Sequence, residues 1–194
     1  MSTRSVIATA KAAMPHGLAA VNALYGNPRG PGRVNAEWYA ASIVMMPLPY
    51  PMRLAWDTDN EVRRIAVHRL CMPDLTAILQ DIYNHCRLEA KQRFGFEHDT
   101  AFYDVKTLGI LGYYGLDLYG GAFNYRLKRG GSSLSTHSWG IAIDIDPARN
   151  GMGDTTPNMP QFAVNAFERR GWLWGGHWKG KGCDGMHFQR ATGV

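Results

Sequence analysis

The sequence predicts a loop-rich α+β fold. The 194-residue chain carries 22 glycines and 10 prolines, which favours many turns over a helical bundle. One long segment has the apolar spacing of an amphipathic helix, whereas short segments elsewhere alternate in the manner of strands. Hydrophobic residues make up 45% and charged residues 19%, an ordinary balance for a globular protein. The length suits one domain with a sizeable core, with or without an N-terminal extension.

The first quarter of the chain predicts helix, then loop, then extended chain. Residues 3–25 look like one or two short helices, the second beginning near Pro15, which a first helical turn tolerates. The Gly- and Pro-rich residues 27–32 predict a loop. Residues 46–51 must be extended, because three prolines at alternate positions exclude both a helix and a central strand.

A strand is expected at residues 62–68, and the clearest helix of the chain follows it. Its apolar side chains recur at helical spacing and predict a stripe packed in the core: Leu75, Ile78, Leu79, Ile82, Tyr83 and Cys86. Pro73 is tolerated in a first turn, and Gly95 lies just beyond the expected end.

The second half predicts shorter elements. Residues 109–121 are rich in Gly and Tyr and indicate turns and short strands. Residues 141–146 alternate as a strand with one apolar face. A helix is expected over residues 160–170, stopped at Gly171, and residues 186–189 read as a short closing strand.

Charge and cysteine content narrow the function classes. The net charge of +5 and the pI near 9.2 favour anionic surroundings, such as nucleic acid, an acidic membrane face or a bacterial wall polymer. The basic residues are scattered, which argues against nucleic acid. Three distant cysteines without a CxxC pair suggest neither a disulfide framework nor a four-cysteine zinc site, so we expect free thiols.

Targeting signals are not evident in the sequence. The Ala-rich residues 6–24 are interrupted by charged and helix-breaking residues, so no ordinary signal peptide is expected. No apolar run approaches the roughly 20 residues that span a bilayer, so no integral membrane segment is expected. We therefore expect the protein to be made in the cytoplasm.

Four residues in two segments carry the chemistry. On the strand at 141–146, Asp144 points away from the apolar face, and His137 precedes that strand. His187 belongs to the second short strand, three residues after Asp184. A catalytic zinc needs three protein ligands, a position left to water, and a base beside that water. The pattern therefore predicts a zinc hydrolase with His137, Asp144 and His187 as ligands and Asp184 as base.

Other assignments remain open for these residues. Taken singly, His137 suits an exposed loop, Asp144 an ion pair with a nearby Arg, and Asp184 a loop cap. Asp146 is a rival for either carboxylate role because alternation places it on the face of Asp144. Cys183 is a rival ligand because it adjoins Asp184.

The order and spacing of these motifs resemble a known family. Ser-x-His-x-x-Gly-x-Ala-x-Asp, then Trp-Gly-Gly-x-Trp, then Asp-x-Met-His-Phe is similar to zinc D-alanyl-D-alanine carboxypeptidases and L-alanyl-D-glutamate endopeptidases. That family includes VanX- and VanY-type enzymes and many phage endolysins, and it shares its fold with the hedgehog signalling domain. The matching residues are Ser135, His137, Gly140, Ala142, Asp144, residues 174–178, Asp184, His187 and Phe188, with residues 120–126 upstream.

The resemblance implies a fold and a division of roles. It implies a small antiparallel sheet with flanking helices and one zinc ion on the sheet, in a peptidase domain at residues 45–194. Residues 1–44 match nothing in the family and are expected to form an N-terminal helical extension. The three ligands and Asp184 keep the roles given above, and Arg126 orients substrate or stabilises the oxyanion.

Several neighbouring residues have less specific roles. Ser135 binds substrate or caps a turn, and His177 reaches the site or stays structural. Trp174 and Trp178 line a cleft or pack in the core. Gln189 replaces the Glu that family members often carry, so it receives no proton-transfer role.

The function implied is hydrolysis of an amide bond in the peptidoglycan stem peptide by a monomeric enzyme. The expected type is a phage endolysin of L-alanyl-D-glutamate specificity, acting on the wall after a holin opens the membrane. The alternatives are a D-alanyl-D-alanine carboxypeptidase and a non-catalytic wall-binding module. The sequence leaves the bond cleaved, the wall chemistry and the role of residues 1–44 open.

Overall fold

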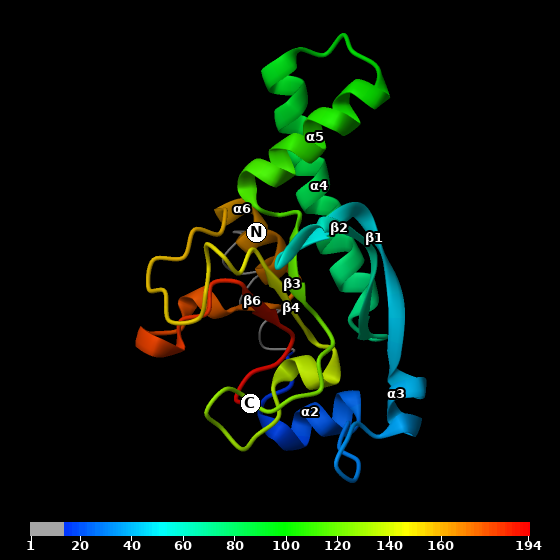
Figure 1. Ribbon diagram of the computed structural model, residues 1–194, viewed down its shortest axis with the longest axis vertical. Helices are drawn as coiled ribbons and strands as arrows, with labels where there is room; N and C mark the ends of the chain where they lie inside the picture. The colour runs from blue at the N-terminus through cyan, green and yellow to red at the C-terminus, as the bar shows by residue number, and fades with distance from the viewer. Residues whose placement is uncertain (1–13) are drawn as a thin grey trace.

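The computed structural model describes residues 14–194 and has an α+β architecture built around one mixed six-stranded sheet (Figure 1). The strand order is β2-β1-β3-β4-β6-β5. The helices are α2 (Gly17–Tyr25), α3 (Ala36–Ser42), α4 (Met72–Phe94), α5 (Thr100–Tyr114) and α6 (Gln161–Arg169), and the strands are β1 (Ile43–Leu54), β2 (Asp57–His68), β3 (Leu118–Gly121), β4 (Ala142–Ile145), β5 (Leu173–Trp174) and β6 (His187–Gln189). Three short 3₁₀ helices, η1 (Thr136–Trp139), η2 (Gly175–His177) and η3 (Gly180–Gly182), lie near the strand ends.

The α+β prediction is confirmed, and most expected elements lie where the sequence placed them. The second N-terminal helix is α2, and the strands expected at 62–68, 141–146 and 186–189 are β2, β4 and β6. A helix expected in residues 3–13 lies outside the described part of the chain. No helix within residues 14–194 is both long and apolar enough to cross a bilayer.

The sheet is not wholly antiparallel, which corrects the expectation taken from the family. β3 pairs with β1 in parallel through Arg53–Leu118 and Leu54–Tyr119, whereas the other pairs are antiparallel. Between β2 and β3 the chain passes through α4 and α5, and it then returns along the free edge of β1 in the same direction as that strand. A parallel pair needs such a long connection.

The proline-rich residues 46–51 are extended, as expected, and lie inside β1. Although β1 lies between two strands in the sheet order, β3 joins it only at Arg53 and Leu54, and within residues 46–51 only Met46 and Pro47 pair with β2. The β1–β2 register shifts between Pro47 and Met52, where two of the prolines fall. The prolines therefore lie in a part of β1 that has a neighbour on one side only and that contains a bulge. The missing N–H groups of proline cost few ladder hydrogen bonds there.

The helix α4 follows the predicted stripe. Pro73 lies in its first turn, Asp74 and the pair Lys91 and Arg93 complement the dipole at the two ends, and Gly95 ends it. The predicted residues Leu75, Ile78, Leu79, Ile82 and Cys86 are fully buried, while Tyr83 is partly buried. This face of α4 packs against β1 and α6.

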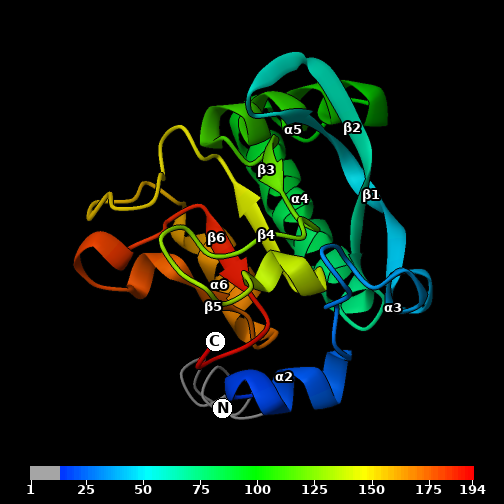
Figure 2. The same cartoon turned by 60° about the horizontal axis from the view of Figure 1, so that its bottom comes forward.

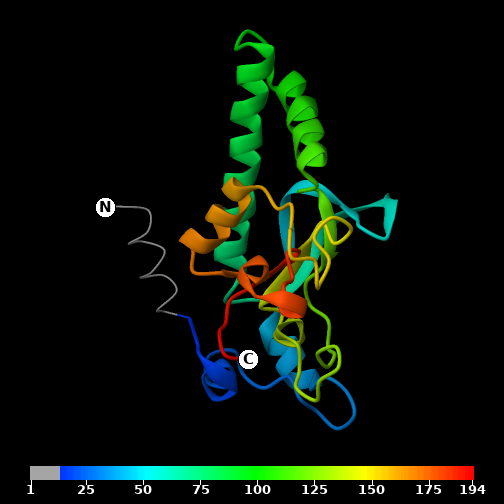
Figure 3. The same cartoon turned by 90° about the vertical axis from the view of Figure 1, so that its left-hand side faces the viewer.

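Residues 109–114 are helical, which corrects the prediction of turns and short strands there. They form the second half of α5. Asp99 caps the start of this helix, where its side chain accepts a hydrogen bond from the Phe102 amide at 2.8 Å, and Gly115 caps its end with φ 71°. α5 packs along α4, and the two form a helical hairpin that projects from the body (Figures 1 and 3). This packing stabilises a helix that contains Gly109 and Gly112, whose intrinsic propensity is low.

The two faces of the β4–β6 pair have different environments (Figure 2). Ile143 lies opposite Phe188 on the face covered by α6, where Phe188 stacks on Phe167 at a centroid distance of 3.9 Å. The residues on the other face are also paired directly, Asp144 with His187 and Ala142 with Gln189. Hydrophobic burial of the first face thus holds the polar side chains of the second in fixed register.

Candidate metal centre and active site

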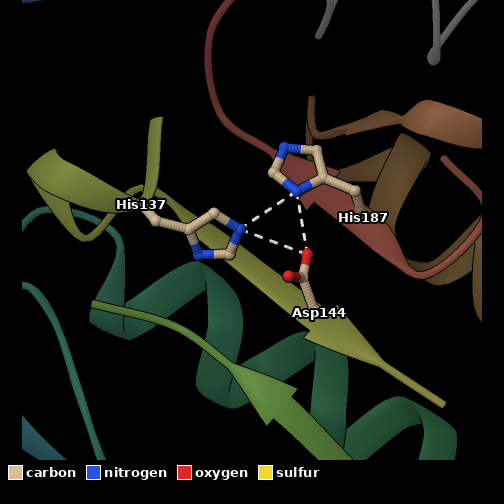
Figure 4. A group of neighbouring side chains, drawn as sticks. All are labelled: His137, Asp144 and His187. Carbon is tan, nitrogen blue, oxygen red and sulfur yellow. Dashed lines mark hydrogen bonds and ion pairs between the residues drawn. The ribbon is translucent and has the colours of Figure 1, made fainter. Parts of the chain in front are cut away.

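Three side chains from three elements converge on the polar face of the sheet (Figure 4). His137 comes from η1, Asp144 from β4 and His187 from β6, and all three are buried. The Nε2 atom of His137 lies 3.2 Å from Asp144 Oδ1 and 3.2 Å from His187 Nδ1. His187 Nδ1 lies 2.8 Å from Asp144 Oδ1. The residues predicted as ligands are therefore brought together by the fold.

Sheet register and one glycine explain this convergence. Asp144 and His187 are direct partners across the β4–β6 ladder, so their side chains leave the sheet side by side. His137 reaches them because η1 ends at Gly140 with φ 67°, a left-handed conformation that favours glycine. A Cβ at Gly140 would lie 2.8 Å from the backbone nitrogen of His68, so no larger residue fits this approach of loop to sheet.

Hydrogen bonds orient both imidazoles for coordination. His137 Nδ1 lies 2.6 Å from the carbonyl oxygen of Ala122, which can only accept, so Nδ1 carries the proton and Nε2 keeps its lone pair. On the other ring, His187 Nε2 lies 3.0 Å from Gln189 Oε1. The Gln189 amide is itself fixed, because its Nε2 donates to the Ala191 carbonyl at 2.8 Å. This arrangement directs His187 Nδ1 toward the other two donor atoms.

The electrostatics of the group favour an ionised carboxylate. Burial alone would raise the pKa of Asp144, but the contacts with His137 and His187, which donate to the carboxylate when their rings are protonated, outweigh burial and hold the pKa well below its usual range. For His187 burial acts in the opposite direction and lowers the pKa. The hydrogen bond to Asp144 outweighs burial, so the pKa of His187 is raised. One charged carboxylate between two imidazoles is a suitable environment for a divalent cation.

The donor set and its spacing fit a tetrahedral metal. Ligands bound to zinc at about 2.0–2.1 Å are separated from one another by roughly 3.3 Å along the tetrahedral edges. The three donor–donor distances of 3.2, 3.2 and 2.8 Å are close to that value. Two nitrogens and one carboxylate oxygen leave one corner of the tetrahedron open, which is the arrangement of catalytic rather than structural zinc sites.

Asp184 lies beside this group. Its backbone N–H donates to the Gly175 carbonyl at 3.1 Å, and a Cβ at Gly175 would lie 2.5 Å from the Asp184 carbonyl oxygen, so this close approach requires glycine. Within the described residues, Asp184 Oδ1 is buried and has no hydrogen-bond partner. Burial raises the pKa of Asp184, against the opposing charge of His187 and, more weakly, of His137. A half-desolvated carboxylate with a raised pKa is suited to proton transfer.

The three donors and Asp184 line one pocket of about 400 Å³. Arg126 and Ser135 also line it, while the Ser135 hydroxyl additionally accepts a hydrogen bond from the His137 amide at 3.4 Å. Ser135 therefore both lines the pocket and caps the turn that begins η1. The other lining residues are Lys128, Arg129, Thr136, Met152, Trp178, Gly182, Met186, Gln189 and Val194.

The structure does not bring His177 into the pocket. Its Nε2 atom lies 3.1 Å from Glu168 Oε1 on α6, and its ring packs edge-on against Trp174. Trp174 is a core residue whose indole N–H donates to the Gly185 carbonyl at 2.7 Å. Trp178 behaves differently, because it is 37% exposed and lines the pocket with its ring 5.7 Å from that of His187.

Neither rival ligand joins the group. β4 ends at Ile145, and Asp146 has φ 51°, so its carboxylate leaves the face of Asp144 and pairs with Arg149 at 2.7 Å. The Cys183 thiol is buried, and its Sγ lies 3.6 Å from the Gly176 carbonyl oxygen. Cys71, Cys86 and Cys183 are all free and buried, as expected for thiols without a disulfide framework.

Sequence reasoning missed two residues that support His187. Gln189 has a positioning contact although it received no role, and the Thr136 hydroxyl donates to Gln189 Oε1 at 3.0 Å and lies 3.3 Å from His187 Nε2. The signal for Gln189 was its place two residues after His187 on the same strand face. Thr136 gave no signal, since its contact depends on the path of η1.

Comparison with known proteins gives one match. A family model described as D-alanyl-D-alanine carboxypeptidase matches residues 129–190, less than half of the chain. No curated protein and no solved structure matches the chain. The matched segment contains all three candidate ligands and Asp184, but not Arg126. The match therefore supports a peptidase related to the zinc peptidases that the sequence motifs resemble.

Proposed function

We propose that this protein is a zinc-dependent peptidase that hydrolyses an amide bond in the peptidoglycan stem peptide, as an L-alanyl-D-glutamate endopeptidase of the endolysin type. One observation carries the proposal. A three-donor group with an open corner and the half-buried carboxylate of Asp184, whose Oδ1 is buried without a hydrogen-bond partner among the described residues, line the same pocket. Stability does not require that combination, because burying a carboxylate oxygen without a hydrogen-bond partner is unfavourable.

The ligands His137, Asp144 and His187 would hold one zinc ion, which when bound polarises the scissile carbonyl and lowers the pKa of water. Asp184 removes a proton from the attacking water and then delivers it to the departing amine nitrogen. Its raised pKa suits both steps, since a carboxylate of ordinary pKa is a weaker base and holds the proton less well.

Arg126 supplies fixed positive charge on the wall of the pocket. Its backbone is anchored near the metal group, because the Arg126 N–H donates to Ser138 Oγ at 3.0 Å and the Ser135 N–H donates to the Arg126 carbonyl at 3.0 Å. The guanidinium orients the substrate or stabilises the oxyanion that forms at the carbonyl, which suits its forked donors. Ser135, at the same wall, offers a hydroxyl for the substrate backbone.

As an endolysin the enzyme acts on the wall as a monomer after a holin opens the membrane. The net charge of +5 supports this setting, because wall polymers are anionic.

A D-alanyl-D-alanine carboxypeptidase is the second candidate, favoured by the description of the matching family model. Both activities use the same metal and base and differ in the bond presented to them. A non-catalytic wall-binding module is the third candidate, and the buried Oδ1 of Asp184, which has no hydrogen-bond partner among the described residues, argues against it.

The test is incubation of the purified protein with peptidoglycan fragments, followed by mass spectrometry of the released termini. New L-Ala and D-Glu ends indicate the endopeptidase, free D-Ala indicates the carboxypeptidase, and intact fragments indicate a binder. Elemental analysis of the same preparation measures bound zinc.

Two variants separate the roles in this test. Asp184→Asn is expected to retain zinc and to lose turnover by about 100-fold or more, which is typical of removing a general base. His187→Ala is expected to lose both zinc and turnover. Activity of Asp184→Asn equal to that of the wild type would remove the base assignment.

A further inference from the structure

One wall of the pocket carries more positive charge than the proposed chemistry uses. Arg126, Lys128 and Arg129 all line the pocket and come from a single turn of the chain. Asp144 and Asp184 are the only acidic residues among the lining residues, and both already have roles at the metal. Among the side chains that line the pocket, three cations therefore accompany two carboxylates, and Lys128 and Arg129 remain unassigned.

The base of this turn is fixed to the metal group. Leu127 and Leu134 form a β-bridge, and the Lys128 N–H donates to the Ser133 carbonyl at 2.9 Å. Beyond the bridge, the Ser138 hydroxyl holds the Arg126 amide, and Ser138 follows His137 in η1. The positions of the cations along the pocket wall are thus tied to the position of a metal ligand.

These cations have no carboxylate partners. Within residues 14–194, no ion pair between a basic side chain and a carboxylate includes Arg126, Lys128 or Arg129. The Arg126 Nη1 donates only to the carbonyl of its neighbour Leu127, at 3.3 Å. The charge of Arg129 nevertheless reaches the site, because it acts electrostatically on Asp184. Like charges gathered without counter-charges repel one another, and a bound anion removes that repulsion.

We propose that Lys128 and Arg129 form an anion subsite that binds a free carboxylate of the substrate residue next to the scissile amide. This inference rests on the proposed peptidase function and names its substrate class: acidic peptides whose carboxylate beside the cleaved bond is not amidated. The anion is a carboxylate of the peptide itself, because the pocket that holds the cations also holds the metal group. A volume of about 400 Å³ suits a short peptide segment presenting both groups at once.

The test compares two synthetic stem peptides that differ at one group. Both contain L-alanyl-γ-D-glutamyl, with the α-carboxylate of the D-glutamyl residue free in one peptide and converted to the carboxamide in the other. The wild-type, zinc-loaded protein is expected to cleave the free acid with a kcat/KM about 10–100-fold higher, the range for hydrogen bonds to a charged group. Rising salt is expected to reduce this preference.

The double variant Lys128→Gln with Arg129→Gln is expected to lose the preference through a higher KM for the free acid. Its rate on the amidated peptide and its zinc content should stay at wild-type levels. The matched control is Arg64→Gln with Lys181→Gln, which removes the same net charge from residues that do not line the pocket. The control should keep the full preference.

The possible outcomes distinguish failure of the anion subsite from failure of the proposed peptidase function. Cleavage of both peptides at equal rates by the wild type, or a preference that survives in the double variant, overturns the anion subsite and leaves the peptidase intact. Cleavage of neither peptide by zinc-loaded wild type overturns both proposals.

Discussion

Replacing Gln189 by Leu is expected to weaken metal binding although Gln189 is not a ligand. The side chain is buried, and its Oε1 accepts a hydrogen bond from Thr136 at 3.0 Å and lies 3.0 Å from His187 Nε2. Its Nε2 donates to the Ala191 carbonyl at 2.8 Å. When His187 Nδ1 coordinates a metal, Nε2 carries the ring proton, and Gln189 Oε1 is the acceptor that stabilises this tautomer.

The magnitude follows from these contacts. Leu has a similar volume, so the main loss is three hydrogen bonds, which leaves two buried donors and one buried acceptor without partners. At roughly 1–3 kcal/mol for each such group, with partial relaxation, the free energy of unfolding should fall by about 2–5 kcal/mol. Loss of the group that orients a metal-binding His typically reduces metal affinity by about 10–100-fold.

Chelator competition measures the metal affinity, and urea denaturation measures the stability. Two variants serve as controls. Gln189→Glu keeps an acceptor beside His187 and should bind metal at least as tightly as the wild type, but it should lose stability because it cannot donate to the Ala191 carbonyl. Thr136→Val removes one contact and should cost about 1 kcal/mol of stability with little change in metal affinity. The ¹⁵N chemical shifts of His187 in zinc-loaded wild type should show the proton on Nε2. A folded Gln189→Leu protein that binds zinc as tightly as wild type would refute the reasoning.

Three further predictions concern other parts of the site. In metal-free protein, Asp184→Asn should raise the melting temperature at neutral pH. Burial raises the pKa of Asp184, so the fold loses stability as pH rises through that pKa, and the advantage of Asn should vanish below about pH 4. Gly140→Ala should reduce the free energy of unfolding by about 1–3 kcal/mol through its left-handed backbone alone, and by more through the clash with His68, as denaturation will measure. Trp178→Ala should leave zinc content unchanged and raise KM by about 2–10-fold, the range for one aromatic contact, whereas an unchanged KM would remove Trp178 from the substrate wall.

The parts of the site that the sequence predicted are those governed by short-range periodicity. Alternation over residues 141–146 placed the Asp144 side chain on the polar face, and the same rule placed His187 and Gln189 together on the next strand. The register that sets Asp144 opposite His187 depends on tertiary packing, so periodicity could not predict it. The family resemblance implied only that the two residues bind the same ion.

The errors arose where a local pattern met a tertiary constraint. Strand alternation predicted that Asp146 lies on the same face as Asp144. However, β4 ends at Ile145, and the positive φ of Asp146 turns its side chain away from that face. Gly109 and Gly112 resemble turn residues, yet packing against α4 stabilises helix through both. For His177 the sequence left a site role and a structural role open, and the ring turns toward Glu168 on α6.

The strand order implies that the metal group is completed late in the synthesis and folding of the chain. β6 pairs with β4 on one side and with β5 on the other, and it is the last of the six strands along the chain. During synthesis, His137 and Asp144 leave the ribosome roughly 40–50 residues before His187, and at typical speeds about 2–10 seconds separate them. A nascent chain therefore has an incomplete coordination set until the β-ladder closes, which delays any hydrolytic activity until the core beneath it has formed.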